Sequence, residues 1–170
     1  MASDTVSHRI LIAGFGSVLR GDDAFGPAVI EALDSSGGLS PHARTIEIGT
    51  AGLNLVRELF DGYNALVIVD ALDRGGEPGT VYVLDVEVPG IDTLADEARR
   101  ALAADMHATV PARALLVASA VGVLPSRVWL VGCQPASCDE YGEMSAPVQQ
   151  AIRGAAEAVR TLVANVRESS

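Results

Sequence analysis

The segment Ala65–Asp70 (ALVIVD) places the strongest constraint on the fold of this chain. It has five consecutive apolar residues and no polar residue before its final aspartate. A strand of this kind is buried on both faces, as central strands of parallel sheets are. A strand with one solvent-exposed face instead alternates polar and apolar residues. Parallel neighbours need long crossover connections, which are usually helices. The segment therefore predicts a central strand in an α/β protein.

Four further segments complete the predicted sheet. Three of them, Arg9–Gly14, Thr45–Ile48 and Arg127–Cys133, are apolar runs separated by helical patterns, so parallel strands are expected there. The fourth, Val81–Leu84, follows the central strand across the turn-rich segment Asp73–Thr80, a connection too short for a parallel crossover. This fourth strand is therefore predicted to be antiparallel and near an edge of the sheet.

Apolar residues at helical spacing lie between the strands. The first predicted helix carries Pro27 in its first turn, where a missing N–H does no harm. The second helix follows the turn Gly49–Gly52, the third starts near His107, and the last is capped by Ser145. The predicted inward-facing positions are Phe25, Val29 and Leu33; Leu53, Val56 and Leu59 or Phe60; Val110, Ala114, Val117 and Val121; and Val148, Ile152, Ala155, Val159, Leu162 and Val166.

Strands alternating with helices predict a three-layer α/β/α sandwich. Its sheet is expected to be mixed and five-stranded, mostly parallel, with one antiparallel strand in the edge region. The 170 residues favour one domain spanning residues 1–170, since a domain usually has about 100–200 residues. The polar ends, about residues 1–7 and 168–170, are expected to be loose.

The charged residues exclude several classes of function. All 12 basic residues are arginine, so the chain has no lysine for a P-loop, a Schiff base or a Ser-Lys dyad. The 22 acidic residues give a net charge of −10, which would repel a nucleic acid backbone. The longest apolar run is too short to span a membrane, the polar start resembles no secretion signal, and the cysteines Cys133 and Cys138 have no metal or redox spacing. A cytoplasmic protein without a nucleic acid or membrane partner is expected.

Candidate reactive side chains follow the predicted strands. Ligands of open α/β sheets bind outside the carboxyl ends of the strands. Asp22 and Asp23 follow the first strand across a loop, Asp70 ends the central strand, and His107 lies at or just before the helix that precedes the last strand. Two carboxylates and one imidazole suit a divalent ion such as Zn²⁺ or Ni²⁺. An Asp–His pair working as acid and base would use the same atoms.

Simpler roles exist for some of these residues. Asp22 or Asp23 could cap the following helix, and a lone histidine such as His107 is more often a surface or satisfied residue than a ligand. Asp70 has no such simple alternative, because a carboxylate that ends an apolar central strand is costly unless it is paired, hydrogen-bonded or bound to a metal.

Other catalytic and binding motifs are absent or incomplete. The loop Gly14–Leu19 has the first two glycines of a dinucleotide fingerprint but leucine in place of the third. The sequence has no G-x-S-x-G elbow, and neither cysteine has an identifiable partner base. Dinucleotide binding and serine or cysteine peptidase chemistry are therefore not expected.

Five ordered blocks of the sequence resemble the hydrogenase maturation proteases, which trim the C-terminus of the large subunit of nickel–iron hydrogenases. The blocks are ILIAGFGSVLRGDDAFGPAVIEAL (Ile10–Leu33), GTAGLNLV (Gly49–Val56), VIVDALDRGGEPGTVY (Val67–Tyr82), VGCQPAS (Val131–Ser137) and EMSAPVQQAI (Glu143–Ile152). A histidine follows the third block at the distance expected in the family. The order and spacing of these blocks, rather than any one of them, carry the resemblance.

The resemblance implies a function and a set of site residues. Asp23, Asp70 and His107 match the family's metal-binding and catalytic positions, and the turn with Gly49, Thr50 and Gly52 would contact the substrate chain. The implied partner is a large-subunit precursor, and nickel would be supplied by that precursor. The chain itself is expected to be a monomer. Water would be activated either by nickel or by an aspartate such as Asp70 or Asp22.

Two departures from the family pattern are visible. Ser17 replaces the usual asparagine of the first block, and the residues around His107 match the family only loosely.

Two other functions remain open from the sequence. One is a non-catalytic nickel-binding checkpoint or chaperone for hydrogenase assembly, and the other is a nucleotide or phosphate binder of similar shape, which the acidic rim disfavours.

Overall fold

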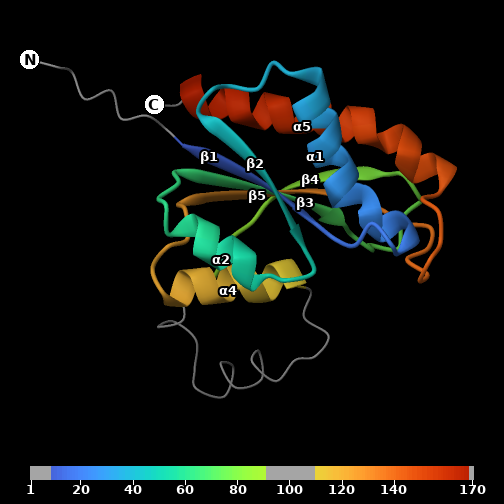
Figure 1. Ribbon diagram of the computed structural model, residues 1–170. Coiled ribbons are helices and arrows are strands. Elements are labelled where there is room, and N and C mark those ends of the chain that lie inside the picture. Colours follow the sequence, from blue (N-terminus) through green and yellow to red (C-terminus); the bar gives the residue numbers. More distant parts are fainter. Residues whose placement is uncertain (1–8, 91–109, 169–170) are drawn as a thin grey trace, which may run out of the picture.

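The sheet has five strands and is covered by helices on both faces (Figure 1). The structure, a computed structural model, describes residues 9–90 and 110–168. The strand order is β2-β1-β3-β5-β4, and all neighbours are parallel except β4, which pairs antiparallel with β5 at the edge. The predicted fold class is confirmed. The strands are β1 (Ile10–Phe15), β2 (Ala43–Gly49), β3 (Ala65–Ala71), β4 (Val81–Asp85) and β5 (Arg127–Cys133).

The central strand β3 is buried as its sequence predicted. Its first five residues are at most 1% exposed, because β1 and β5 flank it and helices cover both of its faces. Ile68 lies opposite Ala13 of β1 and Leu130 of β5. The alternating side chains of β3 therefore enter two separate hydrophobic cores, one on each side of the sheet.

Within residues 9–90 and 110–168, two helices cover each face of the sheet. The helices α1 (Phe25–Ser36) and α5 (Ala146–Glu168) pack together on one face, and α2 (Leu53–Leu59) and α4 (Val110–Ala120) pack together on the other (Figure 1). No helix in residues 9–90 and 110–168 is both long and apolar enough to cross a membrane.

Helix α4 faces the core with a different side from the one predicted. Three of its predicted inward positions, Val110, Val117 and Val121, are 37%, 42% and 50% exposed. The buried residues are Pro111, Ala114, Leu115 and Ala118. The segment is apolar at almost every position (VPARALLVASA), so its spacing fits more than one face and the packing against α2 and the sheet decides.

The start of α1 lies directly on the carboxyl ends of β1 and β3. A Cβ atom on Gly26 would come within 2.1 Å of the Phe15 carbonyl oxygen and 2.6 Å of the Val69 carbonyl oxygen. Only glycine allows this approach of backbones. The short 3-10 helix η1 (Gly21–Ala24), which precedes α1, is thereby held at the same edge of the sheet.

Candidate active site

Asp70 lies at the carboxyl end of β3, where its environment disfavours a negative charge. Burial and, second, the nearby charge of Asp23 raise the pKa of Asp70 to about 7, while the backbone N–H of Ala71 acts to lower it. Two carboxylates that cannot both ionise freely are a common arrangement in acid–base and metal sites. At neutral pH the Asp70 carboxyl group is therefore close to the midpoint of its titration.

Asp23 approaches the same edge from η1. Its Oδ2 atom accepts a hydrogen bond from the backbone N–H of Ser17 at 2.9 Å. The turn is tight, because a Cβ atom on Gly16, whose φ is +116°, would lie 1.9 Å from the Asp23 carbonyl oxygen. Neither Asp22 nor Asp23 caps α1, whose N-cap is Ala24 without a side-chain bond. The structure thus brings Asp23 and Asp70 together at the predicted rim.

Asp22 has a different role from the one that the sequence allowed. Its side chain is buried, and its carboxylate accepts hydrogen bonds from the backbone N–H groups of Ala136, Ser137 and Ser145 and from the Ser145 hydroxyl, at 2.7–3.1 Å. Burial acts to raise the pKa of Asp22, but these four bonds outweigh it and the pKa is lowered. A base needs a free lone pair and an accessible position. The expectation that Asp22 might activate water is therefore wrong.

The third predicted ligand, His107, lies outside the described residues. Among residues 9–90 and 110–168 no group of three histidine, cysteine or acidic side chains could hold a metal ion. The carboxylates of Asp23 and Asp70 could supply two oxygen ligands, and a cation between them would relieve the repulsion that raises the pKa of Asp70. The described pair therefore fits part of a divalent metal site.

The turn Gly49–Gly52 lies beside this rim. The Gly49 carbonyl oxygen accepts a hydrogen bond of 3.1 Å from the N–H of Gly16, which joins the turn to the loop that holds Asp23. Thr50 and Gly52 line one end of an apolar groove of about 240 Å³ between α2 and α4. The other lining residues are Leu53, Val56, Val110, Arg113, Ala114 and Val117.

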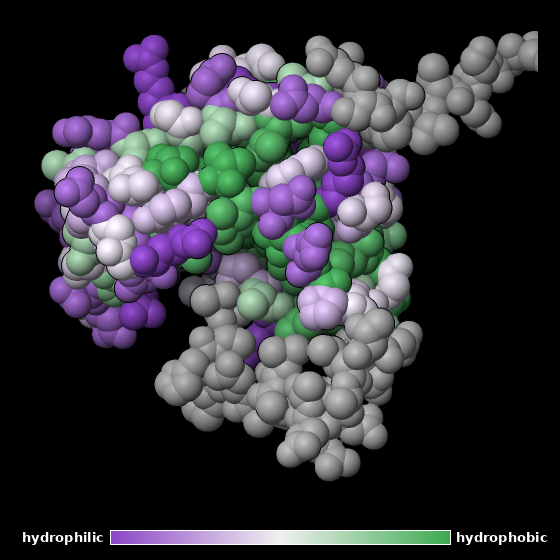
Figure 2. Space-filling model, turned by 180° about the vertical axis from the view of Figure 1, so that it is seen from behind, coloured by the Kyte–Doolittle hydropathy of each residue, from purple (hydrophilic) through white to green (hydrophobic). Residues whose placement is uncertain are grey.

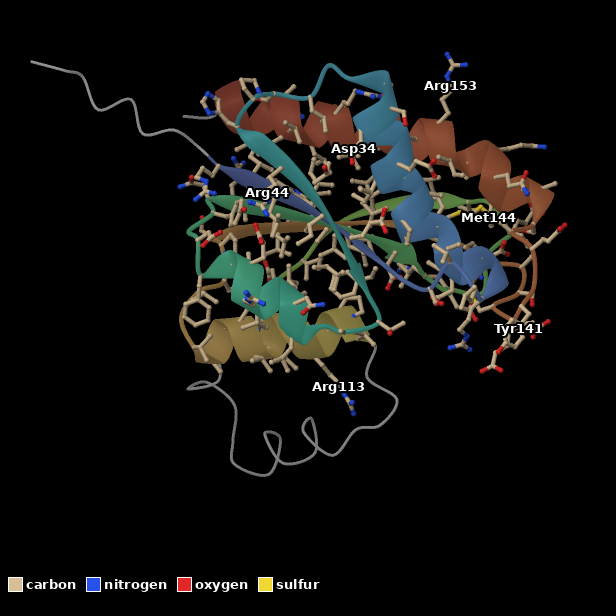
Figure 3. All side chains as sticks on the ribbon, viewed as in Figure 1. Asp34, Arg44, Arg113, Tyr141, Met144 and Arg153 are labelled. Atoms are coloured by element: carbon tan, nitrogen blue, oxygen red, sulfur yellow. The ribbon has the colours of Figure 1, made fainter. Side chains whose placement is uncertain are left out.

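Figure 2 shows the side opposite to Figure 1, with hydrophilic residues gathered at the left-hand end and hydrophobic residues over the middle. Figure 3 shows Arg113 extending from α4 and Tyr141 at the tip of the loop before α5. Among the residues that line the α2–α4 groove, the exposed ones are apolar apart from Thr50 and Arg113.

Neither cysteine thiol is activated as a nucleophile. Burial, and then the charge of Asp22, raise the pKa of the Cys133 thiol to about 11. Burial also raises the pKa of Cys138, and the charges of Asp23, Asp22 and Asp70 add to this effect while Arg20 opposes it. Since the thiolate is the reactive form, both thiols are protonated and unreactive at neutral pH.

Gln134 organises the loop after β3, a role that the sequence did not indicate. Its buried Oε1 atom accepts hydrogen bonds from the backbone N–H groups of Arg74 and Gly76, and its Nε2 atom donates to Asp73. A glutamine that directly follows a strand carries no sequence signal for such contacts, which join residues about sixty positions apart.

Comparisons with known proteins agree on one family. A family model described as hydrogenase maturation protease matches residues 27–162. The hydrogenase expression/formation protein HupD of Rhizobium leguminosarum bv. viciae is 36% identical over 157 residues, which cover 91% of this chain and 74% of HupD. The hydrogenase 2 maturation protease of Escherichia coli K12 is 31% identical over 163 residues, or 95% and 92% of the two chains. The solved structure of the hydrogenase maturating endopeptidase HybD from E. coli superposes with a TM-score of 0.72 at 29% identity and covers 95% of this chain and 94% of its own.

Proposed function

This chain belongs to the hydrogenase maturation protease family, and we propose that it removes a short C-terminal peptide from the nickel-loaded large-subunit precursor of a nickel–iron hydrogenase. The observation that carries the proposal is the pairing of Asp23 with Asp70 at the carboxyl edge of the sheet, where burial and the charge of Asp23 disfavour the ionised form of Asp70. A cation carried by the substrate would favour that ionised form.

In this proposal nickel is part of the substrate. Asp23, Asp70 and His107 contact the ion while the precursor still holds it, so a precursor without nickel is not recognised. Nickel held there would supply Lewis-acid polarisation of a nearby peptide carbonyl. Carboxylate oxygen and imidazole nitrogen are both suitable ligands for this metal.

The hydrolysis itself needs a group that accepts a proton from water. In the metal-free protein the pKa of Asp70 is raised to about 7. A bound cation would lower that pKa, so Asp70 would be ionised and able to accept a proton once the precursor is docked. The water oxygen bonds to the carbonyl carbon, the C–N bond breaks, and the proton passes to the leaving amine.

The groove between α2 and α4 is the proposed binding place for the C-terminal extension of the precursor. Gly49, Thr50 and Gly52 would contact the extension near the rim, and Leu53, Val110 and Val117 would contact its apolar side chains farther along. A partly exposed groove with an apolar lining suits an extended peptide better than a small polar ligand.

A trimming assay with purified precursor tests the proposal. The nickel-loaded precursor should lose its C-terminal peptide, seen as a mass decrease, and the nickel-free precursor should not. Equal trimming of both forms would contradict the recognition of nickel. Binding of the nickel-loaded precursor without any trimming would instead favour the non-catalytic checkpoint.

Variants connect the assay to the named residues. Asp23→Asn and His107→Ala should each abolish trimming. Asp85→Asn and His42→Ala are the matched controls, since Asp85 is exposed on β4 and His42 lies next to the amino end of β1. Full activity in Asp23→Asn or His107→Ala would remove that residue from the proposed site.

A further inference from the structure

Three large apolar side chains at the rim are exposed to water. Val18 and Leu19, in the loop between β1 and η1, are 67% and 61% exposed, and Tyr141, in the loop between β5 and α5, is 85% exposed. We call these three residues the apolar rim. Exposed apolar side chains that gather in one place mark interaction surfaces more often than isolated ones do.

Hydrogen bonds between the two loops hold the apolar rim together. The backbone N–H of Tyr141 donates to the Leu19 carbonyl oxygen at 2.7 Å, and the N–H of Gly21 donates to the Gly142 carbonyl oxygen at 3.1 Å. The buried Asp22 carboxylate adds its four bonds to the same pair of loops. The three side chains therefore form one preorganised surface.

The backbone of Tyr141 is in a conformation that its side chain does not favour. Its φ is +61°, and it is the one residue other than glycine with a positive φ in the part of the chain that the structure describes. A bulky residue is strained in this region, which glycine or asparagine adopts more easily. Because the ring is 85% exposed (Figure 3), packing of the ring within the chain offsets little of this strain energy. The ring is therefore placed for a contact outside the chain.

The apolar rim is continuous with the proposed active site. Val18 directly follows Ser17, whose N–H binds the Asp23 carboxylate. A protein that brings a metal ion to Asp23 would therefore come close to Val18 and Leu19. The exposed residues next to Tyr141, namely Asp139, Glu140 and Glu143, are acidic, and Arg20 is the exposed basic residue beside Leu19.

We propose that the apolar rim docks the folded body of the large-subunit precursor, at a patch of apolar residues bordered by lysine or arginine. This inference rests on the proposed function and extends it, since the C-terminal extension occupies the α2–α4 groove while the body occupies the rim. The acidic border favours a basic partner surface and would repel a second copy of this chain.

The test compares four variants in the trimming of the purified nickel-loaded precursor. Tyr141→Asn removes the ring and keeps a residue that tolerates a positive φ, and Leu19→Ser removes the second apolar side chain. Tyr141→Phe keeps the ring. Phe60→Ser is the matched control, because Phe60 is 65% exposed but lies at the far end of α2.

Tyr141→Asn and Leu19→Ser should each raise KM about tenfold, as loss of a central apolar contact typically does, with kcat within about twofold. Neither variant should lower Tm, and Tyr141→Asn should raise it slightly because the backbone strain is relieved. Tyr141→Phe and Phe60→Ser should behave like the wild type. Unchanged KM in the first two variants would overturn the inference while leaving the proposed function intact. A lowered Tm or an altered oligomeric state would overturn it as well, since the rim would then be covered by this chain or by its copy.

The same variants serve if the wild type binds the precursor without trimming it. The dissociation constant from biolayer interferometry then replaces KM, with the same expected tenfold change. In that case the proposed function fails and the docking surface stands. If the wild type neither trims nor binds the precursor, both proposals are overturned.

Discussion

Asp22 and Asp23 are neighbours in the chain, but their carboxylates have opposite roles. Asp22 is buried and accepts four hydrogen bonds from residues that precede α5. Asp23 remains at the rim, receives one N–H from Ser17 and raises the pKa of Asp70. One carboxylate thus fixes the loops around the site, and the other faces the place where a substrate metal would bind.

The buried position of Asp22 makes the structure dependent on its charge. Asp22→Asn would place an amide N–H₂ among donors that need an acceptor, so the free energy of unfolding should fall by about 3 kcal/mol. Urea denaturation at pH 7 measures this, with Asp85→Asn as the exposed control. Equal stability of Asp22→Asn and the wild type would show that the four bonds are dispensable.

Asp70 should make the metal-free protein less stable as the pH rises. Its folded pKa of about 7 lies above the ordinary value of 3.8, so the folded state binds the proton more tightly than the unfolded state does. The stability contribution is complete below about pH 4 and is lost as the pH rises to 7. Asp70→Asn removes this dependence.

The stability difference between Asp70→Asn and the wild type should therefore grow with pH. Between pH 4.5 and pH 8 the variant should gain about 2–4 kcal/mol relative to the wild type, the upper value corresponding to the whole pKa shift. Urea denaturation at pH 4.5, 6 and 8 without metal measures the gain. A difference that stays constant with pH would contradict the raised pKa.

The α2–α4 groove can be tested through a side chain that contributes little to folding. Leu53 is 77% exposed and lines the groove. Leu53→Asn should leave Tm unchanged and raise the KM for precursor trimming about fivefold, because an apolar contact with the extension is lost. Phe60→Ser, just after the end of the same helix and outside the groove, should leave both quantities unchanged. A normal KM for Leu53→Asn would place the extension elsewhere.

Two glycines should respond in opposite ways to substitution by alanine. At Gly26 the new Cβ atom would meet two carbonyl oxygens at 2.1 and 2.6 Å, so Gly26→Ala should lower the free energy of unfolding by about 3 kcal/mol. Gly154 lies inside α5 with open space around it, and Gly154→Ala should raise that free energy by about 0.5–1 kcal/mol. Thermal denaturation distinguishes the two, and a stable Gly26→Ala would mean that α1 can move away from the sheet.

Several parts of the fold could be predicted because their signals are local. The apolar run of β3 needs burial on both faces wherever it lies, and the short connection to β4 forces an antiparallel strand. The proximity of Asp23 and Asp70 follows from the same logic, since the carboxyl ends of parallel strands share one edge. The contacting face of α4 could not be predicted, because the helix carries valine, alanine or leucine on most of its sides.

The sequence by itself determined the layers of this protein, its central strand and the edge at which its acidic residues meet, because hydrophobic periodicity and connection length act within short segments. Only the tertiary structure decided which aspartate became a structural acceptor and which stayed at the rim. The donors to Asp22 lie more than a hundred residues away in the sequence, so no local sequence pattern predicts them. The exposure of Tyr141 on a left-handed backbone was decided in the same way, by hydrogen bonds between two distant loops.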